Sequence, residues 1–157
     1  MLDKIVEKTK ERVSETKKVN SLDRLKYKIL NIEVKFNYPF KKALSSDDIA
    51  IIAEVKKASP SKGLIAENFD YVSIAKEYEA AGASAISVLT EPYFFQGSDD
   101  YLKEIAKNVK IPVLRKDFVV DEYMIYEAKL LGASAVLLIA AILSDEQLEQ
   151  YLTITRV

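Results

Sequence analysis

Two oppositely charged residues stand at the end of an apolar run that has the composition of a strand. Glu54 and Lys56 are two residues apart, so their side chains point to the same side of a strand, roughly 7 Å apart. A carboxylate and an ammonium at the mouth of an apolar core cost free energy unless a ligand or a partner compensates them. The alternative is an ordinary ion pair at a solvated strand end, which would stabilise the protein little.

A later apolar run ends in further cations. Arg115 and Lys116 close this run, and Asp117 and Phe118 come next. An ammonium group near a reacting carbonyl can donate a proton to it, so Lys116 is a candidate general acid. The chain has no His and no Cys, which leaves Lys, Glu, Asp and Tyr to carry proton transfers. We therefore predict no metal site.

Aromatic residues lie together in the segment that follows the second apolar run. Residues 92–98 read Pro-Tyr-Phe-Phe-Gln-Gly-Ser, and consecutive aromatic side chains in a loop are hard to explain by solubility. They can form a wall for a planar ligand, or they can cover the rim of the fold and contact another subunit. With Glu54, Lys56 and Lys116 they describe a pocket suited to an anionic, aromatic small molecule.

Apolar runs alternate with helical segments from residue 49 onward, and these elements must position the charged residues. The expected strands are 49–55, 85–90, 111–115 and 135–139. The expected helices are 71–81, 98–108, 121–131 and a segment from Ser144. Each strand is almost continuously apolar, as expected where both faces of a sheet are covered. Strict alternation predicts a parallel sheet with right-handed crossovers, in which active groups collect at the carboxyl ends of the strands.

The segment before residue 49 is predicted to be helical. Residues 2–18 place apolar side chains at helical spacing among charges, and Ser21 opens a second helical stretch. The pattern is interrupted at residues 38–40, which read Tyr-Pro-Phe. We expect a short turn through Leu44 to lead from there to the first strand.

A four-residue sequence, Gly-Ala-Ser-Ala, occurs at 82–85 and again at 132–135. In both copies the glycine follows a predicted helix, where a positive φ costs glycine little, and an apolar strand begins at once. An internal duplication of two βα units and a generally favoured helix-to-strand connection both explain the repeat.

The composition limits the classes of function. The 157 residues are 49% hydrophobic and 30% charged, which is typical of one globular domain. A net charge of -1 provides no overall attraction for nucleic acid or for an anionic membrane. The longest apolar run, 133–143, is shorter than the roughly 20 residues of a membrane-spanning helix, and the first residues lack the apolar core of a signal peptide. We expect a cytoplasmic protein that binds neither nucleic acid nor membrane.

Three motifs, in order along the chain, resemble those of the indole-3-glycerol phosphate synthase family. Residues 51–61, Ile-Ile-Ala-Glu-Val-Lys-Lys-Ala-Ser-Pro-Ser, are similar to the family's signature at the first strand. Leu-Thr-Glu at 89–91, leading to Phe-Gln-Gly-Ser at 95–98, and Leu-Arg-Lys-Asp-Phe at 114–118 resemble its second- and third-strand motifs. The resemblance, including the N-terminal helices, covers the whole chain.

The resemblance implies an α/β fold of the TIM (β/α)8-barrel family, here about four βα units preceded by N-terminal helices. Residues 1–157 would form a single domain, with a helical extension over 1–46 and the βα units over 47–157. A complete barrel takes about 250 residues. The family's further site residues, a glutamate after strand 5, an asparagine on strand 6 and backbone phosphate donors after strands 7 and 8, are expected beyond Val157. We therefore expect a truncated form of the enzyme.

In the family, 1-(o-carboxyphenylamino)-1-deoxyribulose 5-phosphate closes to indole-3-glycerol phosphate with loss of CO2 and water, without a metal or an organic cofactor. This is a carboxy-lyase step of tryptophan biosynthesis. By position, the resemblance implies that Lys116 is the general acid for the ribulose carbonyl and that Lys56 holds the substrate carboxylate. Glu54 would orient the two lysines or shuttle a proton. The side chains implied for substrate binding are Ser59, Phe95, Phe118 and Leu137.

Other interpretations stay open from the residues alone. The strands can form an open sheet of their own, or a half-barrel that associates with itself or with a complementary fragment. Open strand edges and an apolar inner face both favour such association. A sibling barrel such as phosphoribosylanthranilate isomerase is disfavoured by the sequence around Lys56 and Lys116 and by the N-terminal helices.

Overall fold

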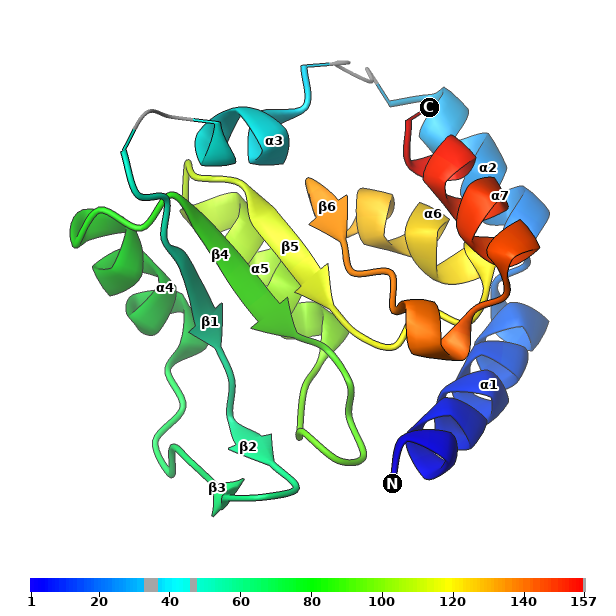
Figure 1. The fold of residues 1–157 in the computed structure, drawn as a ribbon, viewed down its shortest axis with the longest axis horizontal. Helices are drawn as coiled ribbons and strands as arrows, with labels where there is room; N and C mark the ends of the chain where they lie inside the picture. The colour runs from blue at the N-terminus through cyan, green and yellow to red at the C-terminus, as the bar shows by residue number, and fades with distance from the viewer. Residues whose placement is uncertain (33–36, 46–47, 157) are drawn as a thin grey trace.

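The computed structural model describes residues 1–32, 37–45 and 48–156 (Figure 1). The sheet strands are β1 (Ile52–Val55), β4 (Ala85–Leu89), β5 (Val113–Lys116) and β6 (Ala135–Val136). The helices that follow them are α4 (Tyr71–Ala80), α5 (Asp99–Asn108), α6 (Glu122–Leu130) and α7 (Asp145–Thr155). Before the sheet come α1 (Leu2–Val19), α2 (Leu22–Leu30) and α3 (Pro39–Leu44). The predicted boundary between the helical extension and the βα units, at 46–47, lies outside the described residues.

The four strands form one parallel sheet in the order β1-β4-β5-β6. The register pairs Glu54 with Ser87 and Ser87 with Leu114, so these three side chains point to the same face. Val55, Val88 and the other side chains that alternate with them pack against α4 and α5 on the opposite face. Strand and helix alternate through four βα units, which confirms the predicted α/β fold of half a (β/α)-barrel.

Local signals set the ends of the helices. Each helix that follows a sheet strand begins after a cap residue whose side chain accepts a hydrogen bond from a backbone N–H of the first turn; these caps are Asp70, Ser98, Asp121 and Ser144. At the other end, α4 and α6 are followed by Gly82 and Gly132, whose φ angles are +92° and +93°. The predicted positive φ after these helices is confirmed, and each strand then begins within three residues.

The two outer strands are shorter than the sequence predicts. β1 begins at Ile52 rather than at residue 49, and Ile49 and Ile51 keep 92% and 57% of their surface exposed. Among the described strands, β1 has a neighbour only on the β4 side, so pairing cannot extend or cover it. Likewise β6 pairs over two residues, and residues 140–142 form a turn of 3-10 helix. Ile52, the first residue of β1, is itself 43% exposed, so the expectation that both faces of every strand are covered is wrong at β1.

Two short features are absent from the sequence-based expectation. The turn expected through Leu44 is the helix α3, which begins at Pro39; proline in the first turn costs no hydrogen bond and supplies a helical φ. The loop after β1 contains an antiparallel hairpin of β2 (Ala58–Ser59) and β3 (Gly63–Leu64). The hairpin lies just past the carboxyl end of β1, where site residues are expected.

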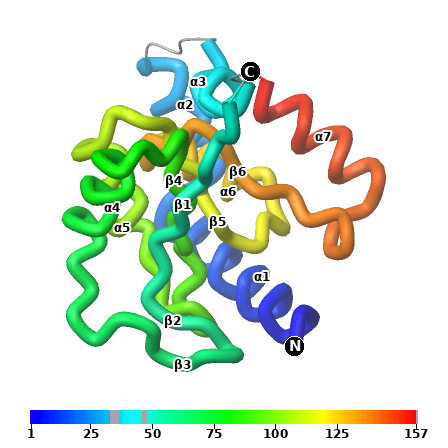
Figure 2. Tube along the Cα trace, turned by 60° about the vertical axis from the view of Figure 1, so that its left-hand side comes forward, coloured from blue at the N-terminus to red at the C-terminus, as the bar shows by residue number. Residues whose placement is uncertain are grey.

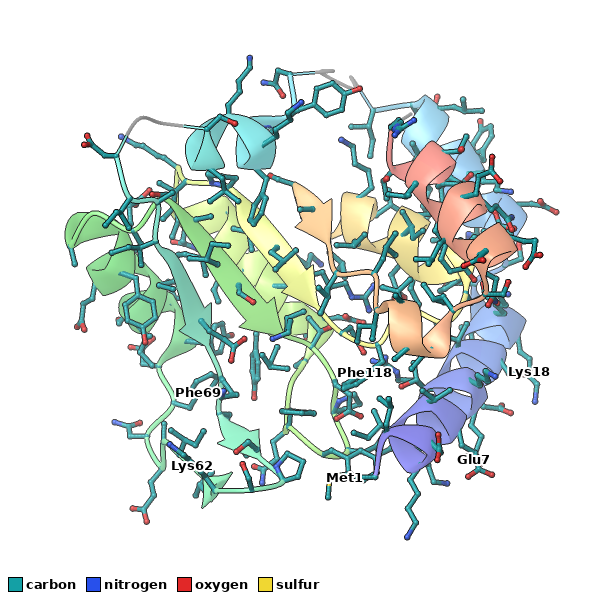
Figure 3. The ribbon with its side chains drawn as sticks, in the orientation of Figure 1. Met1, Glu7, Lys18, Lys62, Phe69 and Phe118 are labelled. Atoms are coloured by element: carbon teal, nitrogen blue, oxygen red, sulfur yellow. The ribbon has the colours of Figure 1, made fainter. Side chains whose placement is uncertain are left out.

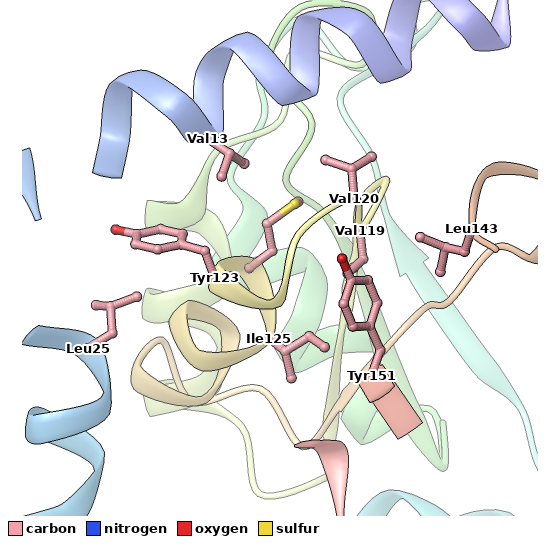
Figure 4. Close-up of a cluster of buried hydrophobic side chains, with 9 residues drawn as sticks. Val13, Leu25, Val119, Val120, Tyr123, Ile125, Leu143 and Tyr151 are labelled. Atoms are coloured by element: carbon pink, nitrogen blue, oxygen red, sulfur yellow. The ribbon is translucent and has the colours of Figure 1, made fainter. Parts of the chain in front are cut away.

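The hydrophobic core is divided between two clusters. One fills the space between the sheet and the helices α4 and α5, with Val55, Val88, Leu102 and Ile105 fully buried. The other joins the N-terminal helices to α6 and α7 through Val13, Leu25, Tyr123 and Tyr151 (Figure 4). Figure 2 shows α4 and α5 on the opposite side of the molecule from α7. The helices α1 and α2 are thus packed against the rest of the fold. No described helix is long and apolar enough to span a membrane.

Candidate active site

The carboxyl ends of β1 and β5 bring three charged side chains together. Lys56 Nζ lies 2.7 Å from Glu54 Oε1, and Lys116 Nζ lies 2.9 Å from Glu54 Oε2. The three side chains are between 29% and 37% exposed, so they are partly shielded and still open to a ligand. Two ammonium groups held on one carboxylate form a compact cationic corner, which can bind an anion or donate a proton.

The electrostatics of this corner centre on Glu54. Burial would raise the pKa of its carboxyl group, but the hydrogen bonds from Lys56 and Lys116 outweigh burial and hold the pKa below its ordinary value. Glu54 is therefore ionised at neutral pH. An ionised carboxylate with both oxygens occupied is better suited to orient the two lysines than to donate a proton.

Arg115 does not join this corner, although the sequence places it beside Lys116. Adjacent residues of a strand point to opposite faces, and Arg115 is buried on the helix side of the sheet. Its guanidinium contacts Asp99 at 2.8 Å, Glu127 at 2.9 Å and the Met124 carbonyl at 3.0 Å. The expectation of several cations at this end of β5 is therefore wrong: one cation, Lys116, faces the candidate site. Arg115 instead connects β5 to α5 and α6.

A buried carboxylate that the sequence did not single out fixes the end of β5. Asp117 is 2% exposed, and its two oxygens accept bonds from Arg12 Nη2 at 3.0 and 2.9 Å. Thr90 Oγ1 donates to it at 2.7 Å, and the backbone N–H of Phe118 donates at 2.8 Å. Asp117 thus joins α1 to the residues on either side of it, Lys116 and Phe118. The only sequence signal was an acidic residue between them.

The aromatic residues expected to face a ligand lie on the same rim. The ring centroids of Phe95 and Phe118 are 6.1 Å apart, with an interplanar angle of 34°. Figure 3 shows Phe118 beyond the carboxyl end of the sheet, on the side of α1. Leu137 follows Val136, the register partner of Arg115, so alternation turns Leu137 toward the face that carries Lys116.

Ser59 is placed differently from the other candidates. It is 9% exposed and lies in the β2–β3 hairpin. Its hydroxyl oxygen accepts a hydrogen bond from Lys62 N at 3.2 Å and lies 3.4 Å from Ser61 Oγ. The described contacts of this side chain are therefore within its own hairpin, and none of them reaches Glu54 or the two lysines.

A cavity of about 430 Å³ lies away from these residues, between α6 and the end of α7. The side chains and backbone that line it include Tyr38, Tyr126, Lys129, Gly132 and Ile154. None of the candidate site residues is among its lining. The candidate site therefore rests on position at the carboxyl ends of the strands and on convergent charge, and not on cavity size.

The sequence of the chain matches the family model described as indole-3-glycerol phosphate synthase over residues 2–156. The chain belongs to the indole-3-glycerol phosphate synthase family. It is 55% identical to the curated indole-3-glycerol phosphate synthase of Ruminiclostridium cellulolyticum over 154 residues, which cover 98% of this chain and 59% of that protein. It is 57% identical to that of Endomicrobium trichonymphae over 152 residues, covering 97% and 59%. The family indicated by the three motifs is confirmed, and the chain spans 59% of the length of these two relatives.

Proposed function

We propose that the protein is an indole-3-glycerol phosphate synthase, a carboxy-lyase of tryptophan biosynthesis. It would convert 1-(o-carboxyphenylamino)-1-deoxyribulose 5-phosphate to indole-3-glycerol phosphate, with loss of CO2 and water. The observation that carries this proposal is the bridge of Glu54 between Lys56 and Lys116, beside the paired rings of Phe95 and Phe118. Residues 1–157 would act as one domain that supplies this part of the site.

Lys116 is the proposed general acid. Ring closure leaves negative charge on the ribulose carbonyl oxygen, and a proton donated from the Lys116 ammonium neutralises it. The Lys56 ammonium would pair with the carboxylate of the substrate, which departs as CO2. Glu54 holds both ammonium groups at one point before substrate arrives, so little reorganisation is needed when the substrate carboxylate and carbonyl replace it as partners.

The remaining candidates would shape the substrate pocket. Phe95 and Phe118 offer faces for the carboxyphenyl ring, and Leu137 extends the apolar wall on the face of Lys116. Ser59 accepts a hydrogen bond from Lys62 N, and its hydroxyl would contact a ligand that approaches the hairpin. No cofactor is proposed, because the family's reaction uses neither a metal nor an organic cofactor.

The test of this function is formation of the indole product from the carboxyphenylamino substrate, followed by the fluorescence of the indole ring. We expect turnover by the full-length protein without any added metal or cofactor. The 157-residue chain, assayed alone at the same concentration, should be inactive if phosphate contacts beyond residue 157 are needed. A full-length protein that binds the substrate but releases no indole product would contradict the proposal.

A second candidate is a structural one: the 157-residue chain associates with itself through the open edge of β1. The observation that favours it is the exposure of Ile49 and Ile51 beside a strand that has no second neighbour among the described strands. Unpaired strand edges with apolar side chains are templates for association. The mass of the chain in solution tests it.

A further inference from the structure

The loop that follows β4, residues 91–97, is held by a buried carboxylate at its first residue. The Glu91 side chain is fully buried, and both of its oxygens accept hydrogen bonds from backbone N–H groups of the same loop. Tyr93 N lies 3.0 Å from Oε1, and Phe94 N and Phe95 N lie 2.7 and 3.1 Å from Oε2. Three donors around one side chain suit a carboxylate, which only accepts and has room for them on its two oxygens.

The far end of the loop is fastened to the same point. Gly97 N donates to the Glu91 carbonyl oxygen at 2.8 Å. A Cβ on Gly97 would lie 2.5 Å from the carbonyl oxygen of Leu89, so only glycine fits against the backbone there. Gln96, with a φ of +50°, turns the chain back toward the strand. The loop is therefore closed around Glu91 at both ends.

The closed loop determines where Phe95 stands. Phe95 is one of the three residues whose backbone N–H bonds to Glu91, and its ring contacts that of Phe118. Phe118 is fixed separately, through its own N–H on Asp117. The two rings that contact each other are thus positioned by two different carboxylates, Phe95 by Glu91 and Phe118 by Asp117.

We propose that Glu91 is a positioning residue that places Phe95 for the aromatic ring of the substrate. A turn can be held by Ser or Asn with a smaller desolvation cost. A buried carboxylate instead holds three consecutive backbone N–H groups at once. The last of these groups belongs to Phe95, whose ring contacts that of Phe118. The inference rests on the proposed function, since it names the part of the substrate that this side of the site recognises.

The test replaces Glu91 by glutamine in the full-length protein. Glu91→Gln keeps the size of the side chain but puts an NH2 group where an oxygen accepts, so at least one loop N–H loses its partner. We expect the KM for the carboxyphenylamino substrate to rise roughly tenfold, with kcat within about twofold because Lys116 is unaffected. The Kd for 2-aminobenzoate, measured by its own fluorescence, should rise by a similar factor. Glu77→Gln, an exposed site on α4, is the matched control and should change neither constant.

Two further variants separate positioning from general stabilisation. Phe95→Leu should raise KM as Glu91→Gln does, and the double variant should be no worse than Phe95→Leu alone, because both changes act on one ring. Glu91→Asp, which keeps a shorter carboxylate, should raise KM less than Glu91→Gln and serves if the glutamine variant does not fold. Hydrogen exchange at the N–H groups of residues 93–95 should speed up in Glu91→Gln and stay unchanged in Glu77→Gln.

The outcomes distinguish the inference from the function on which it rests. A lower Tm in Glu91→Gln with unchanged KM and Kd would reduce Glu91 to a stabilising role and overturn the inference alone. Additive KM effects in the double variant would do the same. Absence of both turnover and 2-aminobenzoate binding in the wild-type protein would overturn the proposed function, and the inference with it.

Discussion

At the scale of single residues, the site depends on one carboxylate shared by two ammonium groups. Burial raises the pKa of Glu54, but the hydrogen bonds from Lys56 and Lys116 outweigh it and keep the group ionised. Both lysines are therefore oriented before a substrate binds. Such preorganisation avoids the cost of arranging charges during the reaction, which is where electrostatic catalysis gains most.

Replacing Lys116 by alanine tests the proposed proton donor. Lys116→Ala removes the ammonium and should lower kcat of the full-length protein by roughly 10²- to 10⁴-fold, the usual contribution of general acid catalysis. Product fluorescence measures kcat, and circular dichroism checks that the fold is kept. Lys107→Ala, which removes an exposed lysine of α5 that pairs with Glu104, should leave kcat unchanged. A Lys116→Ala variant with wild-type kcat would remove the assignment.

The lowered pKa of Glu54 predicts a particular dependence of stability on pH. Its folded pKa lies below the ordinary value of 4.5, so ionised Glu54 stabilises the fold above that value, and the contribution is lost as the pH falls through the folded pKa. Urea unfolding should show a difference between wild type and Glu54→Gln that is constant above about pH 6 and shrinks below about pH 4.5. In a Lys56→Met, Lys116→Met background this decline should disappear; its persistence there would mean that other groups cause it.

At the scale of elements, α1 is coupled to the end of β5 by an ion pair with a buried acidic partner. The Arg12 side chain is 17% exposed and that of Asp117 is fully buried. Asp117 also bonds Thr90 and the Phe118 N–H, so one carboxylate aligns a helix, two strand ends and an aromatic residue of the site. The N-terminal helix α1 is thereby attached to the carboxyl edge of the sheet as well as to the core.

Removing the Arg12 side chain should expose this coupling. Arg12→Ala removes the closer of two cations that contact the buried Asp117 carboxylate and leaves Arg115 Nη2 at 3.7 Å. We expect the free energy of unfolding to fall by about 3 kcal/mol. Lys18→Ala breaks an exposed pair with Glu15 on the same helix and should cost less than about 1 kcal/mol. Urea titration of both variants measures the difference. Equal losses would show that the Arg12 pair is no more than a surface contact.

The order and type of the main elements could be predicted because their signals are local. Apolar runs, cap residues such as Ser144 and the glycines after α4 and α6 depend on a few neighbouring residues. The extents of β1 and β6 could not be predicted, since strand length depends on pairing with strands far away in the sequence. The helix α3 could not be predicted either, because periodicity does not distinguish six helical residues from a turn.

The site could be predicted in part, for the same reason. The spacing of Glu54 and Lys56 shows that they share a face, and the rule that parallel strands end at one edge adds Lys116. The opposite orientation of Arg115 also follows from alternation, but only once the inward face of β5 is known. Arg12 and Asp117 are 105 residues apart in the sequence, so no local pattern could predict their contact. The roles of Ser59 and Leu137 stay predictions.

At the scale of the whole molecule, one face of the sheet is buried and one of its edges is exposed. The side that carries α4 and α5 is sealed by a fully buried cluster. At the outer edge, β1 offers unpaired backbone groups beside the exposed side chains of Ile49 and Ile51. This edge is the surface on which self-association of the 157-residue chain would depend.

A charge placed at this edge tests the association. The wild-type 157-residue chain should show twice the mass of one chain by light scattering, and Ile51→Lys should weaken the dimer by roughly tenfold or more, because edge lysines oppose strand pairing. Leu30→Lys, at an apolar residue of α2 that is more exposed than Ile51, should leave the mass unchanged. A wild-type chain with the mass of one chain would exclude the structural candidate.

The contact between Arg12 and Asp117 also has a consequence for biosynthesis. The two residues are 105 positions apart, so at a translation rate of about 5–20 residues per second the first helix waits roughly 5–20 seconds for its partner to leave the ribosome. During this interval Val13 of α1 and Leu25 of α2 lack their later-synthesised cluster partners, which include Val120 and Tyr123. A segment synthesised before the strands is thus among the last to find its place, and chaperones that bind nascent chains would meet it before its partners do.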